Sequence, residues 1–141
     1  FGTKADCLVA LYEAASHNAL GVLRQSIDPA RDWQGQVEQA MQAYLACLAQ
    51  NPVLLRTLFI EILGLGPTGL AVRRRMNGEL AAFMLGVING DGRARLTPEM
   101  AMMVVGAVNE LVLQAIEQDR VGDLTELAAP AAALVRAVVR Q

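Results

Sequence analysis

Apolar residues recur every three or four positions along most of the chain, which is the spacing that places them on one face of an α-helix. No sustained alternation of apolar and polar residues, the pattern of a half-buried strand, occurs in the sequence. Capping residues, prolines and glycines divide the chain into six helical segments. The sequence therefore predicts an all-α protein, a six-helix bundle in a single domain over residues 1–141.

The first two predicted helices begin at residues that can cap them. Thr3 caps a helix that runs to about Ser26, and Asp6 can serve as the acidic partner of a capping box. Asp32 caps a second helix that runs to about Gln50. Both helices carry one apolar stripe, so we expect each to bury one face.

The third predicted helix, Pro52–Leu63, is apolar nearly all round. Asn51 caps it, and the proline at its first position has no N–H to leave unpaired there. A helix of this kind is expected at the centre of a bundle. Arg56 and Glu61 interrupt its apolar surface, and neither should be buried without a partner. An internal ion pair, a side chain that reaches solvent, or ligand recognition would each satisfy them.

The last three helices follow glycine-rich turns. We expect the fourth over residues 68–89 and the fifth over residues 98–119. A second capping box, with Asp123 as cap and Glu126 returning the bond, begins the sixth. Pro130 lies inside this segment and predicts a kink or a restart there, because its ring clashes with the preceding turn.

Composition and charge narrow the function. The net charge of −2 lacks the basic excess of a self-sufficient nucleic-acid binder. The uninterrupted apolar run "MAMMVVGAV" is far shorter than the roughly 20 residues that span a membrane, so we expect a cytoplasmic protein with no membrane contact. Two isolated cysteines and a single histidine offer neither a disulfide framework nor a metal site. Catalytic pairs and phosphate-binding glycine loops are also missing from the sequence, so we expect no enzyme and no cofactor.

The opening stretch "FGTKADCLVALYEAA" resembles the junction after the DNA-binding domain of the TetR/AcrR family of transcriptional regulators. Phe1, Gly2, Thr3, Lys4 and Leu8 occupy the matching positions. The resemblance implies that residues 1–4 are the remnant of that junction and that the chain lacks most of its helix-turn-helix domain. It also implies that the chain is the effector-binding and dimerisation part of such a regulator, acting as a repressor.

In that family a bound small molecule shifts the dimer away from the conformation that fits operator DNA. The resemblance implies a homodimer, operator DNA and an apolar or aromatic effector as partners, with Lys4 on a DNA phosphate. An ammonium at a helix N-terminus suits a phosphate oxygen, but the residue alone favours a solvated surface lysine, and only the resemblance favours the DNA contact. The alternative function is a stand-alone helical module that binds an apolar ligand or a partner protein without DNA contact.

Methionines and aromatics at helical spacing either fill the core or line an adaptable apolar pocket. Asn109 lies on an apolar face and needs a hydrogen-bond partner, which could be another helix, a second copy or a ligand. The candidate pocket residues are His17, Met41, Tyr44, Phe59, Glu61, Met76, Leu80, Phe83, Met84, Met102 and Asn109.

The last two helices are the expected dimer interface, where small residues let helices approach closely. Its candidate residues are Val104, Val108, Leu111, Ala115, Leu127, Ala131, Leu134 and Val138. The basic run 73–75 spreads around its helix, which indicates a solvated face or, by the resemblance, contact with the DNA-binding domain.

Overall fold

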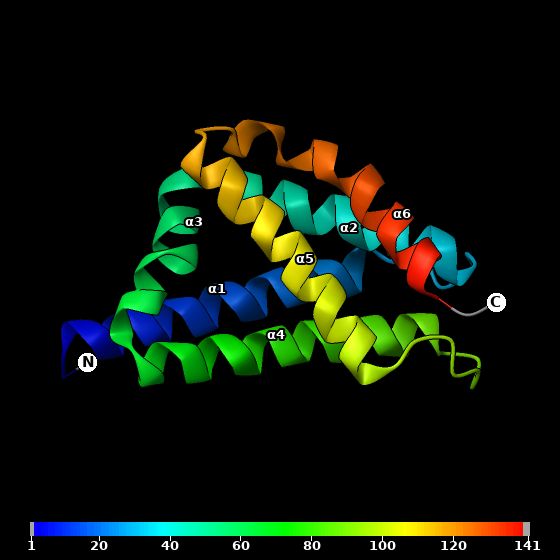
Figure 1. Cartoon of the computed structure of the whole chain (residues 1–141), viewed down its shortest axis with the longest axis horizontal. Coiled ribbons are helices and arrows are strands. Elements are labelled where there is room, and N and C mark those ends of the chain that lie inside the picture. The colour runs from blue at the N-terminus through cyan, green and yellow to red at the C-terminus, as the bar shows by residue number, and fades with distance from the viewer. Residues whose placement is uncertain (1, 140–141) are drawn as a thin grey trace.

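The computed structural model describes residues 2–139, and every regular element among them is helical (Figure 1). The α-helices are α1 (Lys4–Ser26), α2 (Trp33–Ala49), α3 (Pro52–Phe59), α4 (Pro67–Ile88), α5 (Pro98–Glu117) and α6 (Ala128–Val138). Two 3₁₀ segments join them, η1 (Glu61–Leu65) and η2 (Val121–Leu127). The prediction of an all-α fold with six helices is confirmed; residue 1 of the junction motif lies outside the described residues.

Four of the predicted helix starts are confirmed by side-chain hydrogen bonds. In each, a side-chain oxygen accepts the backbone N–H three positions further on, at 2.8 to 3.2 Å. The capping residues are Thr3, Asp32, Asn51 and Thr97. These bonds satisfy N–H groups that have no partner inside the first turn of a helix.

The third helix differs from its prediction. It ends at Phe59, and the chain tightens into η1 instead of continuing to Leu63. Figure 1 shows α3 at one end of the bundle, and the Val53 side chain is 78% exposed. The expectation of a central helix was therefore wrong, because eight residues of α3 are too few to run through the core.

The sixth helix restarts as expected, although the predicted cap is absent. Asp123 lies inside η2, which has no side-chain cap, and its carboxylate lies 3.4 Å from Arg120 Nε. Regular α-helix resumes at Ala128, which leaves Pro130 in the first turn of α6. The first turn tolerates a proline because its N–H groups have no helical partner.

Helices α1 and α4 run side by side in the same direction, and α2 packs on α1 in the opposite direction (Figure 1). Helix α5 crosses in front of them and contacts α4, while α6 and η2 cover α2. Helix α3 and η1 close the end of the bundle at which α1 begins. The main core cluster joins α2, α4, α5 and α6, and a smaller one, around Ile62, joins α1, α3, η1 and α4.

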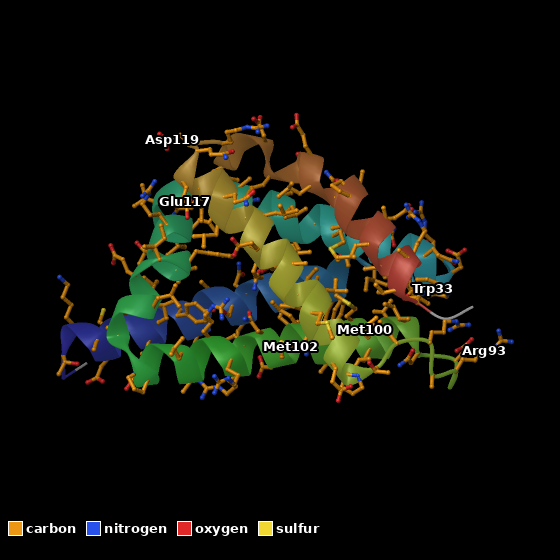
Figure 2. The ribbon with its side chains drawn as sticks, viewed as in Figure 1. Trp33, Arg93, Met100, Met102, Glu117 and Asp119 are labelled. Carbon is orange, nitrogen blue, oxygen red and sulfur yellow. The ribbon has the colours of Figure 1, made fainter. Side chains whose placement is uncertain are left out.

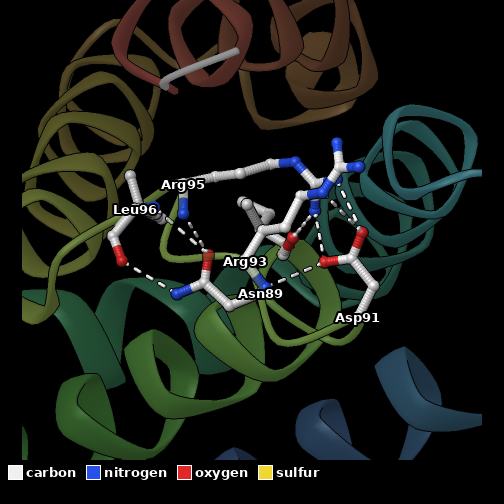
Figure 3. Close-up of polar contacts among 6 residues, drawn as sticks. Asn89, Asp91, Arg93, Arg95 and Leu96 are labelled. Carbon is white, nitrogen blue, oxygen red and sulfur yellow. Dashed lines mark hydrogen bonds and ion pairs between the residues drawn. The ribbon is translucent and has the colours of Figure 1, made fainter.

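The connection between α4 and α5 is held by a compact polar network (Figure 3). The Asn89 side chain accepts from the backbone N–H groups of Arg95 and Leu96 and donates to the Leu96 carbonyl. The Arg95 guanidinium forms two hydrogen bonds with Asp91, at 2.7 and 2.9 Å, and lies 5.9 Å from the centre of the Trp33 ring. This network fixes the start of α5 against α4 and against the N-terminal end of α2.

Within residues 2–139, one helix, α5, is long and apolar enough to cross a membrane by length and composition; α2 with the bent segment α3–η1 meets the same test only if the two are counted as one span. A core helix of a globular bundle meets this criterion too. Seven residues of α5 are buried against the rest of the chain, so this helix is part of the core.

Candidate ligand site

Two cavities lie side by side inside the bundle. The first, of about 60 Å³, is lined by α1, α2, α4 and α5 and is partly open, and its wall is almost entirely apolar. Its lining residues are Leu23, Val37, Ala40, Met41, Tyr44, Leu80, Phe83, Met84, Val87, Val105, Val108 and Asn109. We call it the apolar cavity.

The second cavity, also of about 60 Å³, lies nearer to α3 and has several polar residues in its wall. Its lining residues are Tyr12, Ala15, Ser16, Ala19, Leu20, Tyr44, Leu48, Leu58, Phe59, Arg73, Met76, Asn77, Glu79, Leu80 and Asn109. We call it the polar cavity. Each cavity alone has room for a small ring or a few waters.

Tyr44, Leu80 and Asn109 line both cavities and so form the partition between them. A side-chain rotation of Tyr44 or Leu80 would join the two spaces. The neighbouring Met41, Met76 and Met84 are flexible enough to adapt to such a change. A molecule longer than either cavity would need this partition to open.

Asn109 finds its partner on a neighbouring helix. Its Nδ2 donates to Asn77 Oδ1 at 3.2 Å, and both residues are buried. No fully enclosed side-chain polar atom among the described residues lacks a partner. The second amide group of each asparagine, which makes no further hydrogen bond there, therefore borders accessible space. Asn77 lines the polar cavity, and Asn109 lines both cavities.

Two tyrosines extend this polar wall. Burial raises the pKa of the Tyr44 hydroxyl well above its usual value, and the nearby Tyr12 and Cys47 add to the shift. Burial also raises the pKa of Tyr12, while the positive charge of Arg73 partly offsets it. Both hydroxyls therefore stay protonated near neutral pH and can donate a hydrogen bond.

Most of the predicted pocket residues lie together around these cavities. Those that line one or both cavities are Met41, Tyr44, Phe59, Met76, Leu80, Phe83, Met84 and Asn109. They come from α2, α3, α4 and α5. The structure places them as a pocket requires; their role in binding stays a prediction.

Three predicted pocket residues lie outside both cavities, which corrects the sequence analysis. His17 is exposed, one position round α1 from the lining residue Ser16, and its Nε2 lies 3.5 Å from Glu79. Glu61 is exposed because α3 ends at Phe59, so Glu61 does not continue the inward face of that helix. Met102 is 38% exposed on the outward side of α5 (Figure 2).

Arg73 lines the polar cavity, although its place in a run of three arginines predicts a solvated residue. The three arginines separate in the structure: Arg75 pairs with Glu13 at 2.7 Å, Arg74 is exposed, and Arg73 is half-buried in the cavity wall. The signal was its spacing of four residues from Asn77 on one helix stripe.

The predicted dimer residues lie mainly on the inward side of their helices. Val104, Val108 and Ala131 are buried in the core of this chain and so cannot form an outer surface. Ala115, Leu127, Leu134 and Val138 are half-buried, and only Leu111 of the set is exposed. The face that α5 leaves open lies about one position further round and carries Met103, Gly106, Ala107, Glu110 and Leu111.

Lys4 is exposed in the first turn of α1, as a contact to DNA requires, and no described residue forms an ion pair with it. Further along α1, Glu13 and His17 bind Arg75 and Glu79 of α4. These two contacts hold α1 against α4 along the edge of the polar cavity. Arg56, the charged residue of α3, donates to the Ile116 carbonyl at 3.2 Å and stabilises the C-terminal end of α5.

Comparisons with known proteins do not assign this chain to a family. A scan against protein-family models found no match, and searches of curated proteins and of solved structures found none either.

Proposed function

We propose that this chain is the effector-binding and dimerisation part of a ligand-responsive transcriptional regulator, a repressor that resembles the TetR/AcrR family. An apolar or aromatic small molecule binds at the site that the two cavities form, and its binding shifts a homodimer away from the conformation that fits operator DNA. The proposal combines the sequence resemblance at residues 1–8 with the internal site. It places the regulator in the cytoplasm, away from membranes.

The observation that carries the proposal is the share of α1 in the cavity wall. Five of the residues that line the polar cavity belong to α1, the helix whose first turn carries Lys4. A ligand in this cavity would contact the same rigid element that leads to the proposed DNA-binding domain. A helix transmits a shift along its length because its backbone bonds hold it as one body.

Helix α1 can respond because its contacts with α4 are partly exposed. The Glu13–Arg75 and His17–Glu79 pairs are solvated, and such pairs stabilise by only about 0 to 1 kcal/mol. A ligand that spreads the cavity between α1 and α4 would break these weak pairs and would have to repack the small core cluster that contains Tyr12, Val72 and Met76. The ligand must bind the two conformations unequally for the shift to occur.

The proposed homodimer forms through the open face of α5 together with α6. Met103 on α5 is 63% exposed, and Gly106 and Ala107 beside it allow close approach of a partner helix. On α6 the exposed residues include Ala129, Pro130, Ala133 and Ala137. Two such helices from each copy would form a four-helix interface with two-fold symmetry.

The test uses the complete gene product and a selection of bound duplexes from a random DNA pool. We expect a specific, two-fold-symmetric site, and we expect Lys4→Ala to weaken all duplexes alike and to lower the salt slope by about one. Arg93→Ala is the control, since Arg93 lies at the far end of the molecule from the start of α1 (Figures 1 and 2). Failure to select any site would contradict the regulator and favour the alternative, a helical ligand-binding module without DNA contact. The two cavities are the evidence for that alternative.

A further inference from the structure

We propose that the ligand of the two cavities is an amphipathic monocarboxylate, whose apolar tail fills the apolar cavity and whose carboxylate binds Arg73 in the polar cavity. The inference rests on the proposed ligand site, and it names the chemical class that the site takes. It does not depend on DNA binding.

The first step is the contrast between the cavities. The apolar cavity offers side chains such as Phe83, Met84 and Val105, with polar groups only at the partition. The polar cavity begins at that partition and adds hydroxyl, amide and guanidinium groups. A molecule that fills both spaces therefore needs an apolar part and a polar end, because each polar group moved into an apolar site without a partner opposes binding.

The second step is the charge of the polar end. Arg73 is half-buried in the cavity wall, and among residues 2–139 no carboxylate forms an ion pair with its guanidinium. Its charge acts on the Tyr12 hydroxyl in the same wall. A half-buried cation without a protein partner is a site for an anion, and the planar guanidinium matches a carboxylate through two parallel hydrogen bonds.

The neighbouring groups also suit a carboxylate. The Tyr12 and Tyr44 hydroxyls and the free amide hydrogens of Asn77 are donors, and a carboxylate has only acceptor oxygens. Arg73 is the one cationic side chain in the described wall. Its single positive charge balances the single negative charge of a carboxylate, but it does not balance the two negative charges of a phosphate ester. The geometry thus favours a carboxylate over a phosphate ester.

Glu79 is the one acidic residue in the same wall, and its position keeps it from replacing the ligand. It lies six residues from Arg73, which is about 9 Å further along the helix. Its carboxylate is turned to His17 on the surface, with 41% of the side chain exposed. Glu79 therefore does not pair with Arg73, and the Arg73 guanidinium is available to a bound anion.

The test is calorimetric titration of the complete gene product at neutral pH with hexanoate, octanoate and decanoate, and with the primary alcohols of the same lengths. We expect each added methylene to tighten binding about fourfold until the apolar cavity is filled. We expect the carboxylates to bind about ten to a hundred times more tightly than the alcohols, which is the range of a charge-assisted hydrogen bond.

Three variants assign this preference to one residue. Arg73→Met should abolish the preference for carboxylates and leave alcohol binding unchanged, while Arg73→Lys should retain part of it. Arg74→Met is the matched control, because it removes the same charge from the exposed neighbouring position and should change neither affinity. Thermal unfolding of each variant shows that alcohol binding is compared between folded proteins.

Equal affinities for carboxylates and alcohols would overturn the inference, and so would an equal loss in Arg73→Met and Arg74→Met. Alcohols that bind while carboxylates do not would leave the proposed function standing and this inference wrong. No binding of either series at about 1 mM would also overturn it. Carboxylates that bind through Arg73 without any change in DNA affinity would support the inference and contradict the proposed regulator.

Discussion

Asn109 Nδ2 donates a hydrogen bond of 3.2 Å to Asn77 Oδ1, and this bond joins α5 to α4 at the partition between the two cavities. The two amides are the buried polar pair of an otherwise apolar helix contact. The bond holds the two helices in register beside the two cavities. The same pair therefore joins α4 to α5 and borders the proposed ligand site.

Asn109→Leu should destabilise the protein by about 1 to 3 kcal/mol, because it leaves the Asn77 amide without its partner. Asn77→Leu should have a similar effect, and the double variant should be less destabilised than the sum of the two. Urea unfolding of the four proteins in a double-mutant cycle measures this coupling. Strictly additive effects would show that the bond contributes nothing to the α4–α5 contact.

Gly69→Ala should destabilise by about 1 to 3 kcal/mol, the usual effect of overpacking. A Cβ at this position would overlap the carbonyl oxygen of Ile62, where α4 passes closely over η1. Gly86→Ala is the control in the same helix: a Cβ there meets nothing, so it should stabilise by about 0.5 to 1 kcal/mol. Chemical denaturation measures both changes, and a shift of the same sign in the two variants would contradict this packing.

Asp91 should make stability depend on acid pH. The side chain of Arg95, followed by the backbone N–H of Arg93, lowers the pKa of the Asp91 carboxyl from its usual 3.8 to about 2. A lowered pKa in the folded state means that the contribution is present above the unfolded pKa. It is lost as the pH falls from about 4 to about 2.

Denaturant midpoints measured across this pH window test the prediction. Asp91→Asn should flatten the fall in stability that the natural protein shows between about pH 4 and pH 2. Glu117→Gln is the matched control, because it also removes one carboxylate, from an exposed position at the C-terminal end of α5 (Figure 2). Identical acid profiles of Asp91→Asn and the natural protein would refute a role for the Asp91–Arg95 pair.

Ala107→Glu should convert the proposed dimer into a monomer. Ala107 lies on the open face of α5, and a two-fold interface would bury the new charge twice. We expect the dissociation constant to rise at least about a hundredfold. Sedimentation equilibrium measures it, with Ala14→Glu, an exposed position on α1, as control. A natural protein that is monomeric at micromolar concentration would contradict the dimer itself.

Local signals in the sequence were sufficient for the fold class and for most helix starts. The caps at Thr3, Asp32, Asn51 and Thr97 are short-range bonds between a side chain and its own helix, so the sequence around each cap predicts it. The early end of α3 at Phe59 depends on how η1 packs under α4 at Gly69, which is a tertiary contact.

The site was predicted in part for a related reason. Helices α2 and α4 each have one apolar face, so the sequence places Tyr44 and Phe83 inside the bundle, where they line the apolar cavity. Helix α5 is apolar on both faces, so its periodicity does not show which side meets the core. The predicted interface therefore fell on the buried Val104 and Val108. Arg73 was missed because its neighbours in sequence suggested a surface run, although its helix stripe leads into the cavity.

The most direct measurement is the affinity of the complete gene product for its selected operator, determined by fluorescence anisotropy with and without a ligand that calorimetry shows to saturate the cavities. We expect the ligand to weaken operator binding by about 5- to 150-fold, the usual range of coupling between two sites. By reciprocity the operator should weaken ligand binding by the same factor. An operator affinity that stays unchanged with the cavities fully occupied would contradict the account.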